Sequence, residues 1–319
     1  MIRFENVSKR FDDGTAAVKS LNLTINKGEL FVLIGPSGSG KTTTLKMINR
    51  LVELSEGTIF INGKKISEYD IHELRWNIGY VLQQIALFPH MSIEANIAVV
   101  PEMKKWNKNK IADRVDELLE MVGLDPRKYK HRKPDELSGG QQQRIGVARA
   151  LAADPEIILM DEPFSALDPL SREKLQDDIG KLQKEIKKTI IFVTHDMQEA
   201  LKLGDRICIM KDGEIEQVGT PDELIRHPIN NFVKEFIGKA GHDHFHFNLK
   251  QILSQIGDKD LETGGTSVIP IDSSLEQTLE ALSEQEQIGV ARDGKVIGYL
   301  NRQSMIQYIL NNLKEGDQG

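Results

Sequence analysis

Alternating and continuous apolar runs in the first 200 residues predict a set of short strands. Residues 2–7 and 21–25 alternate between apolar and polar positions, which is typical of strands with one buried face. Three runs, at residues 30–34, 157–160 and 190–193, are continuously apolar, as expected for strands covered on both faces. Because helical patterns precede and separate these runs, the sequence predicts a parallel α/β sheet.

Apolar residues at helical spacing predict the main helices. Residues 42–51 carry apolar side chains three positions apart, and residues 93–124 read as largely helical with one apolar face. That face consists of Ile111, Val115, Leu118, Leu119 and Val122. We expect a helical subdomain at about residues 84–142.

The pattern restarts on a smaller scale towards the end of the sequence. A short strand at 268–272 precedes a helix, two further strands flank a turn at 292–295 as in a hairpin, and a last helix follows. We therefore expect one unit at residues 1–237 and a second at 249–319, joined by a linker at 238–248.

Length and composition narrow the class of protein. A chain of 319 residues has the length of roughly two domains. No apolar run approaches the ~20 residues needed to span a bilayer, and the first residues alternate like a strand instead of resembling a signal peptide. We expect neither an integral membrane protein nor a secreted one. Cys208 is the only cysteine, which excludes an internal disulfide or a cysteine-cluster metal site and fits a reducing cytoplasm.

Charge is distributed unevenly along the chain. There are 41 Lys and Arg against 48 Asp and Glu, a net charge of −7, and residues 242–319 alone contain 6 against 12. The acidic excess supports a separate C-terminal unit. Because no long basic stripe is present, we expect no nucleic-acid partner.

A glycine-rich segment matches G-x-x-x-x-G-K-[ST] between a predicted strand and a predicted helix. Its residues are Gly35, Pro36, Ser37, Gly38, Ser39, Gly40, Lys41 and Thr42, followed by Thr43. Glycines let backbone N–H groups curl around phosphate oxygens, and the helix N-terminus adds positive potential. Lys41 is expected on the β- and γ-phosphates and Thr42 on Mg²⁺. The alternative is a plain glycine-rich turn, but the strand–loop–helix context favours a site for a nucleotide such as ATP.

Two carboxylates end the apolar run at 157–160. Asp161 has the position of a Walker B acid, which can hold Mg²⁺ through water. Glu162 points elsewhere and could polarise the attacking water. Solvated acids at a strand end are the alternative, and the glycine-rich loop upstream favours the catalytic interpretation.

A second glycine-rich helix start follows Leu137. Its residues are Ser138, Gly139, Gly140 and Gln141, and a helical pattern continues from them. Such a start can bind an anion, or it can simply cap a helix. Two phosphate-binding segments in one chain suggest a shared nucleotide.

Taken in order, these motifs resemble the ATPase subunits of ABC transporters. The order comprises the Walker A loop, Gln83, residues 137–141, the Walker B acids, residues 165–168 and His195, within about residues 1–237. The resemblance implies a P-loop NTPase fold with a RecA-like core, an antiparallel β subdomain and a helical subdomain. It also implies a head-to-tail homodimer holding two ATP molecules, each between one chain's P-loop and the other chain's Ser138 and Gly140.

The same resemblance suggests roles for single residues. It implies that Gln83 senses Mg²⁺ and the lytic water, that Asp168 lies at the dimer interface, and that His195 contacts the γ-phosphate. A histidine after a strand is usually structural, but the setting of residues 192–196 favours the switch role. Phe11 stands 24 residues before Gly35, where ABC ATPases place an aromatic ring against adenine. A core phenylalanine is the alternative.

Residues 42–51 and 83–91 resemble those of bacterial quaternary-amine importers, which take up glycine betaine, carnitine or choline as osmoprotectants. The resemblance implies transmembrane permease subunits, indirectly an extracellular substrate-binding protein, and a peripheral position on the cytoplasmic face of the membrane. Amino-acid importers share much of these segments, so an ATPase for another small solute remains open. A soluble ABC protein of DNA repair or translation and an exporter half are less favoured.

Apolar residues between Gln83 and Asn96 are expected to contact the permease. They are Ile85, Leu87, Phe88 and Met91, and an exposed apolar patch rimmed by polar groups is typical of a partner surface. Packing inside the helical subdomain is the alternative.

The second unit is similar in its element order to a single CBS motif, a small α+β unit that quaternary-amine importers often append in pairs. The resemblance suggests a regulator that pairs with its twin in the dimer and senses ionic strength or binds a nucleotide such as cyclic di-AMP. His242, His244 and His246 alternate along the chain, which leaves metal binding or a solvated linker open.

Overall fold

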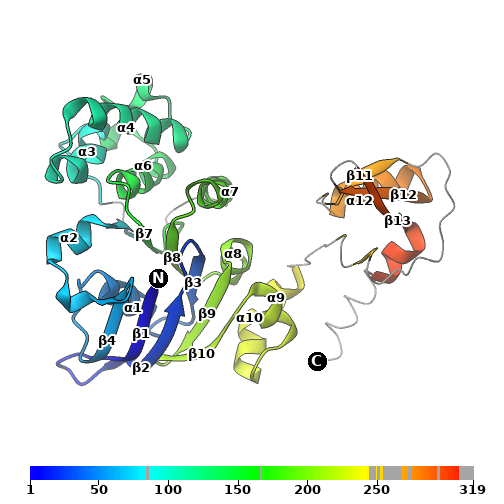
Figure 1. The fold of residues 1–319 in the computed structure, drawn as a ribbon, viewed down its shortest axis with the longest axis horizontal. Coiled ribbons are helices and arrows are strands. Elements are labelled where there is room, and N and C mark those ends of the chain that lie inside the picture. Colours follow the sequence, from blue (N-terminus) through cyan, green and yellow to red (C-terminus); the bar gives the residue numbers. More distant parts are fainter. Residues whose placement is uncertain are drawn as a thin grey trace. The chain divides into compact units, whose positions relative to one another are not determined.

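The computed structural model describes residues 1–83, 86–165, 167, 169–243, 249, 252–253, 267–271, 273, 275–292 and 295–308. The chain divides into two compact units, Met1–Gly238 and Lys239–Gly319. Each is described by itself below (Figure 1).

A six-stranded sheet runs through the first unit in the order β10-β9-β3-β8-β7-β6. The strands are β3 (Leu30–Ile34), β6 (Ile78–Val81), β7 (Ile157–Asp161), β8 (Thr189–Thr194), β9 (Arg206–Lys211) and β10 (Glu214–Gly219). Neighbours from β9 to β6 pair in parallel, and β10 pairs antiparallel at the edge. Every residue of β3, β7 and β8 is buried, so both faces of these central strands are covered. The predicted parallel sheet is present, with one antiparallel edge strand.

A four-stranded antiparallel sheet packs beside it in the order β2-β1-β4-β5. Its strands are β1 (Ile2–Arg10), β2 (Ala16–Ile25), β4 (Glu56–Ile61) and β5 (Lys64–Lys65). Phe4 and Leu21 of this sheet share one apolar core with Leu33 and Leu159 of the other. The core therefore joins the two sheets into one unit.

Helix α1 (Lys41–Ile48) buries Leu45 and Ile48 in that same core. The sequence pattern predicts that this helix continues to residue 51. That prediction is wrong, because the helix ends at Ile48. The helix stops because Arg50 has a positive φ of 53°, and the Arg75 guanidinium holds the carbonyls of Asn49 and Arg50 at 3.2 and 2.9 Å.

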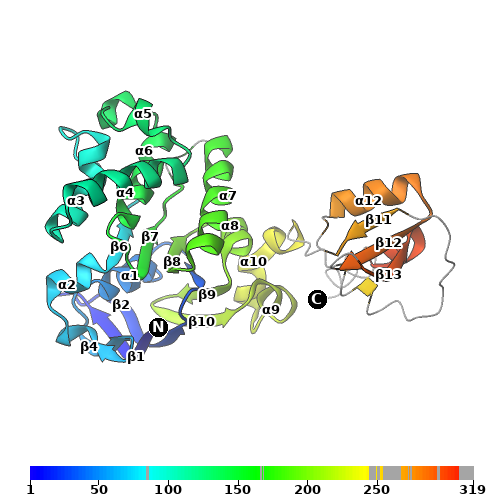
Figure 2. The same ribbon diagram turned by 45° about the horizontal axis from the view of Figure 1, so that its top comes forward.

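Several helices form a group of their own, apart from the two sheets (Figures 1 and 2). They are α3 (Ile93–Met103), α4 (Lys108–Met121), α5 (Pro126–Tyr129) and α6 (Gly139–Leu151). The predicted helical stretch 93–124 is thus two helices, because Lys105 adopts a positive φ of 56° and the Asn107 side chain caps α4 through the Lys110 N–H at 2.7 Å.

The remaining helices of this unit connect the strands or follow them. They are α2 (Ile71–Trp76), α7 (Pro169–Ile186), α8 (Met197–Leu203), α9 (Pro221–Arg226) and the part of α10 (Asn231–Asp243) up to Gly238. The backbone of α10 breaks at Gly238 (φ 46°, ψ −138°), where the first unit ends. No helix in the described part of the chain is long and apolar enough to cross a membrane.

The second unit contains a three-stranded sheet. Its described elements are β11 (Val268–Pro270), α12 (Leu275–Glu284), β12 (Gln287–Arg292) and β13 (Lys295–Asn301). Strand β11 is parallel to β12, and β12 and β13 pair antiparallel, as predicted for the hairpin. A small core fills the unit, made by Leu249, Ile252, Leu282, Ile288, Val290, Leu300, Met305 and Tyr308.

Candidate functional site

The loop between β3 and α1 packs closely against the backbone of neighbouring segments. A Cβ at Gly35 would lie 2.1 Å from the Met210 carbonyl oxygen, and one at Gly40 would lie 2.4 Å from that of Ala17. Gly40, which precedes the first residue of α1, also has a positive φ of 97°. Glycine is therefore required at both positions. The first N–H groups of α1 have no carbonyl partner within the helix, which makes this end of the helix suitable for an anion.

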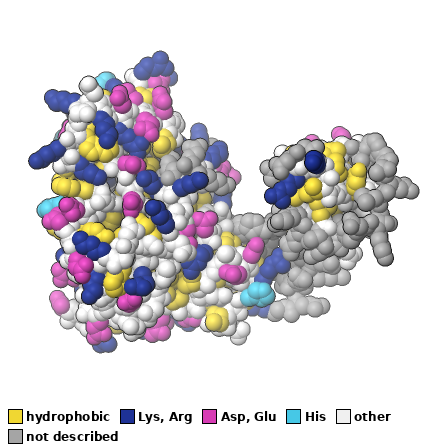
Figure 3. Space-filling view, viewed as in Figure 1, with side chains coloured by type: hydrophobic (Ala, Val, Ile, Leu, Met, Phe, Trp, Pro, Cys, Tyr) yellow, Lys and Arg dark blue, Asp and Glu magenta, His cyan; other side chains and the backbone are white. Residues whose placement is uncertain are grey.

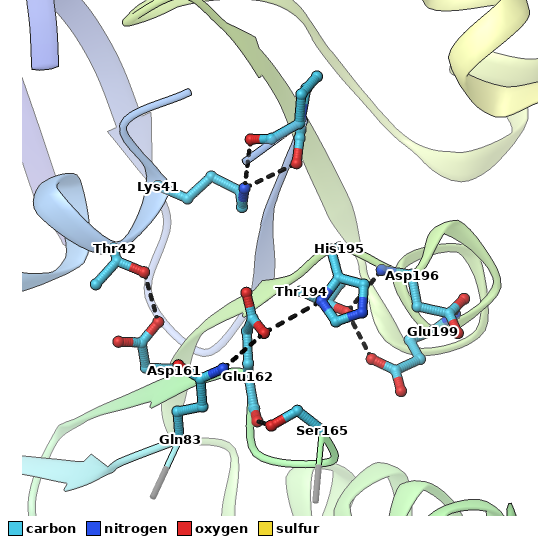
Figure 4. A network of polar contacts seen from close by, with 12 residues as sticks. Lys41, Thr42, Gln83, Asp161, Glu162, Ser165, Thr194, His195, Asp196 and Glu199 are labelled. Atoms are coloured by element: carbon cyan, nitrogen blue, oxygen red, sulfur yellow. Dashed lines mark hydrogen bonds and ion pairs between the residues drawn. The ribbon is translucent and has the colours of Figure 1, made fainter. Parts of the chain in front are cut away.

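Lys41 bends back over its own loop. Its Nζ donates to the carbonyl oxygens of Gly35 and Pro36 at 2.7 and 2.9 Å (Figure 4). Burial lowers the pKa of this ammonium group, although the nearby acids oppose the shift. The hydroxyl oxygen of Ser39 is buried and has no hydrogen-bond partner among the described residues. A buried ammonium and an unpartnered hydroxyl in a glycine loop fit a phosphate chain.

Oxygen ligands suited to Mg²⁺ lie directly beside the loop. Thr42 Oγ1 donates to Asp161 Oδ1 at 2.8 Å, and the Tyr80 hydroxyl donates to Asp161 Oδ2 at 3.4 Å. Burial raises the pKa of the Asp161 carboxyl group. Mg²⁺ binds proteins through one or two such oxygens together with substrate phosphates and water. The pair Thr42 and Asp161 therefore fits the predicted magnesium site, and Tyr80, which the sequence analysis missed, fixes the carboxylate.

Three predicted catalytic residues meet at one carboxylate oxygen. Glu162 Oε2 accepts a hydrogen bond from Gln83 Nε2 at 3.1 Å and lies 3.1 Å from His195 Nδ1 (Figure 4). Gln83 follows β6, Glu162 follows β7, and His195 follows β8. Because these strands are parallel neighbours, their carboxyl ends meet at one edge of the sheet.

The backbone of Glu162 is unusual for a residue that has a side chain. Its φ is +44°, and its N–H donates to the Val193 carbonyl at 3.0 Å. A left-handed conformation is costly for a residue other than glycine, although it also occurs in turns of this chain such as those at Arg50 and Lys105. Here it turns the chain directly after β7, so that Asp161 and Glu162 can serve different partners.

The second glycine-rich segment forms a helix cap. Ser138 Oγ accepts from the Gln141 N–H at 3.3 Å, and Gln141 Oε1 accepts from the Ser138 N–H at 3.0 Å. Gln141 Nε2 donates to the Tyr129 hydroxyl at 3.1 Å. No hydrogen bond within the described residues joins Ser138, Gly139, Gly140 or Gln141 to the P-loop. In both ribbon views, α6 lies in the helical group and away from α1, so the two glycine-rich segments lie apart within one chain (Figures 1 and 2).

Of Phe11, Asp168 and the three histidines of the predicted linker, the structure describes the side chain of Phe11 alone. Phe11 is 41% exposed in the turn between β1 and β2, and the Lys9 ammonium lies 5.0 Å from its ring centroid, so the alternative of a core phenylalanine is wrong. Asp168 lies outside the described residues, as do the side chains of His242, His244 and His246.

The expected permease-contact segment is only partly exposed. Phe88 and Met91 are 47% and 41% exposed, whereas Leu87 is buried, so assigning Leu87 to an exposed patch was wrong. Ile85 lies outside the described residues. The buried Asn96 side chain fixes the loop, because its Oδ1 accepts from the Phe88 N–H at 2.7 Å and its Nδ2 donates to the Phe88 carbonyl at 3.1 Å. On the face of the first unit shown in Figure 3, basic and acidic side chains are interspersed.

Comparison with known proteins adds independent findings. Residues 18–165 match the family model described as "ABC transporter". The chain is 61% identical over 239 residues to the glycine betaine/carnitine/choline transport ATP-binding protein OpuCA of Bacillus subtilis, covering 75% of this chain and 63% of OpuCA. It is 50% identical over 240 residues to the glycine betaine uptake system ATP-binding protein YehX of Escherichia coli, covering 75% of this chain and 77% of YehX.

Among solved structures, the chain resembles a dimeric post-hydrolysis state of the ATP-binding cassette MJ0796 bound to ADP and Pi. The TM-score is 0.62 at 39% identity, and the match covers 69% of this chain and 98% of that cassette. The match to OpuCA, in contrast, spans only about three fifths of that relative's length.

Proposed function

The chain belongs to the ABC transporter family, and on that basis we propose that it is the ATP-hydrolysing subunit of an importer for quaternary-amine osmoprotectants such as glycine betaine, carnitine or choline. The observation that carries the hydrolytic part is the meeting of Gln83, Glu162 and His195 beside the loop that holds Lys41.

In this proposal, the residues of one chain divide the work on ATP. Residues 35–43 hold the phosphates through backbone N–H groups and Lys41, and the ring of Phe11 stacks on adenine. Magnesium bound by Thr42 and Asp161, with Gln83 nearby, would neutralise charge on the phosphates. Glu162 orients and polarises the attacking water, and His195 contacts the γ-phosphate from the neighbouring strand end.

The second half of the site comes from another copy of the chain. Ser138 Oγ accepts from a backbone N–H inside its own chain, which leaves the proton of its hydroxyl available to a partner's phosphate. The separation of the two phosphate-binding segments within one chain supports a head-to-tail homodimer with Ser138, Gly139, Gly140 and Gln141 facing the partner's ATP and Asp168 at the interface. The dimeric MJ0796 cassette is consistent with such an arrangement.

The assignment of transported solute rests on the relatives. OpuCA is described as a glycine betaine/carnitine/choline transport protein and YehX as part of a glycine betaine uptake system. We infer a peripheral position at the cytoplasmic face of the membrane, bound to permease subunits through the exposed side chains of Phe88 and Met91. We also propose that residues 249–319 form one CBS-like regulatory unit, which the order β11, α12, β12, β13 supports.

Uptake by the reconstituted complex tests the proposal. Proteoliposomes that carry the permease, with this chain on the inner face of the membrane, should take up labelled glycine betaine, carnitine or choline. Uptake should require ATP inside the vesicles. Proteoliposomes that contain the permease without this chain serve as the control. Uptake of amino acids and none of the quaternary amines would support the alternative of an amino-acid importer. ATP hydrolysis without uptake of any solute would contradict the transport assignment.

A further inference from the structure

A carboxylate behind His195 has no role in the site described so far. Glu199 lies in the first turn of α8, four residues after His195, and is only 6% exposed. Burial raises the pKa of this side chain. Glu162, His195 and Glu199 all line a small cavity of about 50 Å³, so Glu199 sits directly behind the catalytic residues.

Hydrogen bonds connect Glu199 to both neighbours of His195. Thr194 Oγ1 donates to Glu199 Oε2 at 2.6 Å, and this threonine oxygen accepts from the Asp196 N–H at 3.0 Å (Figure 4). A hydroxyl has one proton, so committing it to Glu199 directs its lone pairs at the Asp196 N–H. The backbone on both sides of His195 is thereby held.

The other carboxylate oxygen reaches a different helix. Glu199 Oε1 accepts from Gln176 Nε2 of α7 at 3.3 Å, and Gln176 Oε1 in turn accepts from Lys202 Nζ at 3.4 Å. Helix α7 begins directly after the loop that follows Glu162. Glu199 therefore connects the turn carrying His195 to the helix that continues from the Walker B loop.

In the arrangement observed, Glu199 connects the two elements by accepting with both of its oxygens. Both oxygens of Glu199 accept hydrogen bonds, whereas a glutamine in its place would present one acceptor and one donor. If its amide group faced the amide group of Gln176, that contact would be lost unless Gln176 turned over and gave up its 3.4 Å contact with Lys202. If its amide group faced Thr194 instead, the Thr194 hydroxyl would lose the acceptor for its proton. An apolar residue would leave the Thr194 hydroxyl without its acceptor.

We propose that Glu199 is a positioning residue for ATP hydrolysis, which holds the turn of His195 so that the imidazole reaches Glu162 and the γ-phosphate. The proposal rests on the proposed hydrolytic function. It differs from a merely structural role because the effect of Glu199 must pass through His195.

The first test compares Glu199→Gln with wild type in steady-state ATP hydrolysis by the purified full chain. The expected result is a fall in kcat of about 10-fold with an unchanged KM for ATP, since a small displacement of a positioned group is costly while the P-loop contacts persist. Exchanging the pair, in Glu199→Gln with Gln176→Glu, should restore most of the turnover. In that double variant the carboxylate introduced on α7 accepts both from the amide introduced on α8 and from Lys202.

The second test places Glu199→Gln in a His195→Ala background. If Glu199 acts through His195, the second substitution costs no further turnover. The same proportional loss in both backgrounds would overturn the proposal, as would Glu199→Gln turnover within twofold of wild type.

Thr194→Val and Thr194→Ser decide the matter if Glu199→Gln does not fold. Valine removes the hydroxyl link and should reproduce the loss in kcat, whereas serine keeps the hydroxyl and should lose far less. Equal activity of the two would overturn the proposal. Failure of the wild-type chain to hydrolyse ATP would instead contradict the proposed function, so the two failures are distinguishable.

Discussion

The two units of this chain contain the same kinds of elements but differ in where chemistry can gather. In the first unit, three parallel strands end side by side and bring Gln83, Glu162 and His195 to one point. In the second unit, a three-stranded sheet and residues outside its strands share a small apolar core, and no catalytic cluster is evident among the described residues. The site of the first unit therefore depends on three adjacent parallel strands that end at one edge, whereas the second unit has a single parallel pair, β11 and β12.

The largest expected effect is on ATP hydrolysis, from a substitution at the sheet edge where β6, β7 and β8 end. Glu162→Gln should preserve ATP binding and reduce ATP turnover by about 10²–10⁴-fold, because a positioned base is lost. Turnover measured by phosphate release, with nucleotide binding measured in parallel, checks this. Glu173→Gln, an exposed acid on α7, is the matched control. Turnover of Glu162→Gln within a few-fold of wild type would remove Glu162 from the role.

The next effect concerns binding that precedes chemistry. Lys41→Ala deletes a charged contact to phosphate and should weaken ATP binding by about 10- to 100-fold. Mixing this variant with Ser138→Arg tests whether the two glycine-rich segments act within one chain or across the dimer. If Ser138 acts across the dimer, heterodimers hold one intact site and one doubly damaged site, and ATP-dependent pairing and activity reappear. A mixture without any recovery would count against the shared site.

A smaller effect is expected at the surface that we propose contacts a permease. Phe88→Asp should reduce solute uptake by about 10-fold or more, because an exposed aromatic anchor becomes charged, while ATP hydrolysis by the purified chain stays near wild type. Met103→Asp, at the similarly exposed last residue of α3, is the matched control. Equal losses of uptake and hydrolysis in Phe88→Asp would indicate misfolding in place of uncoupling.

The smallest effect on hydrolysis is expected from the second unit. Deleting residues 242–319 should leave the ATP hydrolysis rate unchanged and flatten the dependence of uptake on ionic strength. The removed segment carries an excess of acidic residues, whose interactions weaken as salt rises. Uptake assays across a salt series check this. An unaltered salt response would leave dimerisation as the better role for the unit.

The buried strands were predictable because their residues are apolar without interruption. The run at 30–34 coincides with β3, and the runs at 157–160 and 190–193 fall within β7 and β8. Strand β6 was not predicted, since four residues that include Gly79 give too short a pattern. Tyr80 was therefore missed together with its strand.

The chemistry was predictable where a motif places a polar group next to a strand or at a helix start. The role of Glu199 was not predictable, because an acidic residue in a helical sequence pattern is expected to face solvent. Glu199 is buried only because α7 packs against α8. Leu87 and Phe88 show the same limit, since neighbouring apolar residues in a loop point to different environments. Pairwise packing in three dimensions, which periodicity does not contain, decided both cases.

The burial of Cys208 makes it possible to label this protein with a fluorescent dye at a single chosen site. It is the only cysteine in the sequence, it is 0% exposed in β9, and burial raises the pKa of its thiol to about 12. Thiolate is the reactive form, so maleimide dyes should bypass this residue in the folded chain. A cysteine introduced at Ile229 or Ile306, which are 68% and 57% exposed in the first and second units, would then carry the only fluorophore. Cys208 can therefore be kept in both variants. The variant at Ile229 reports on the first unit, and the variant at Ile306 reports on the second.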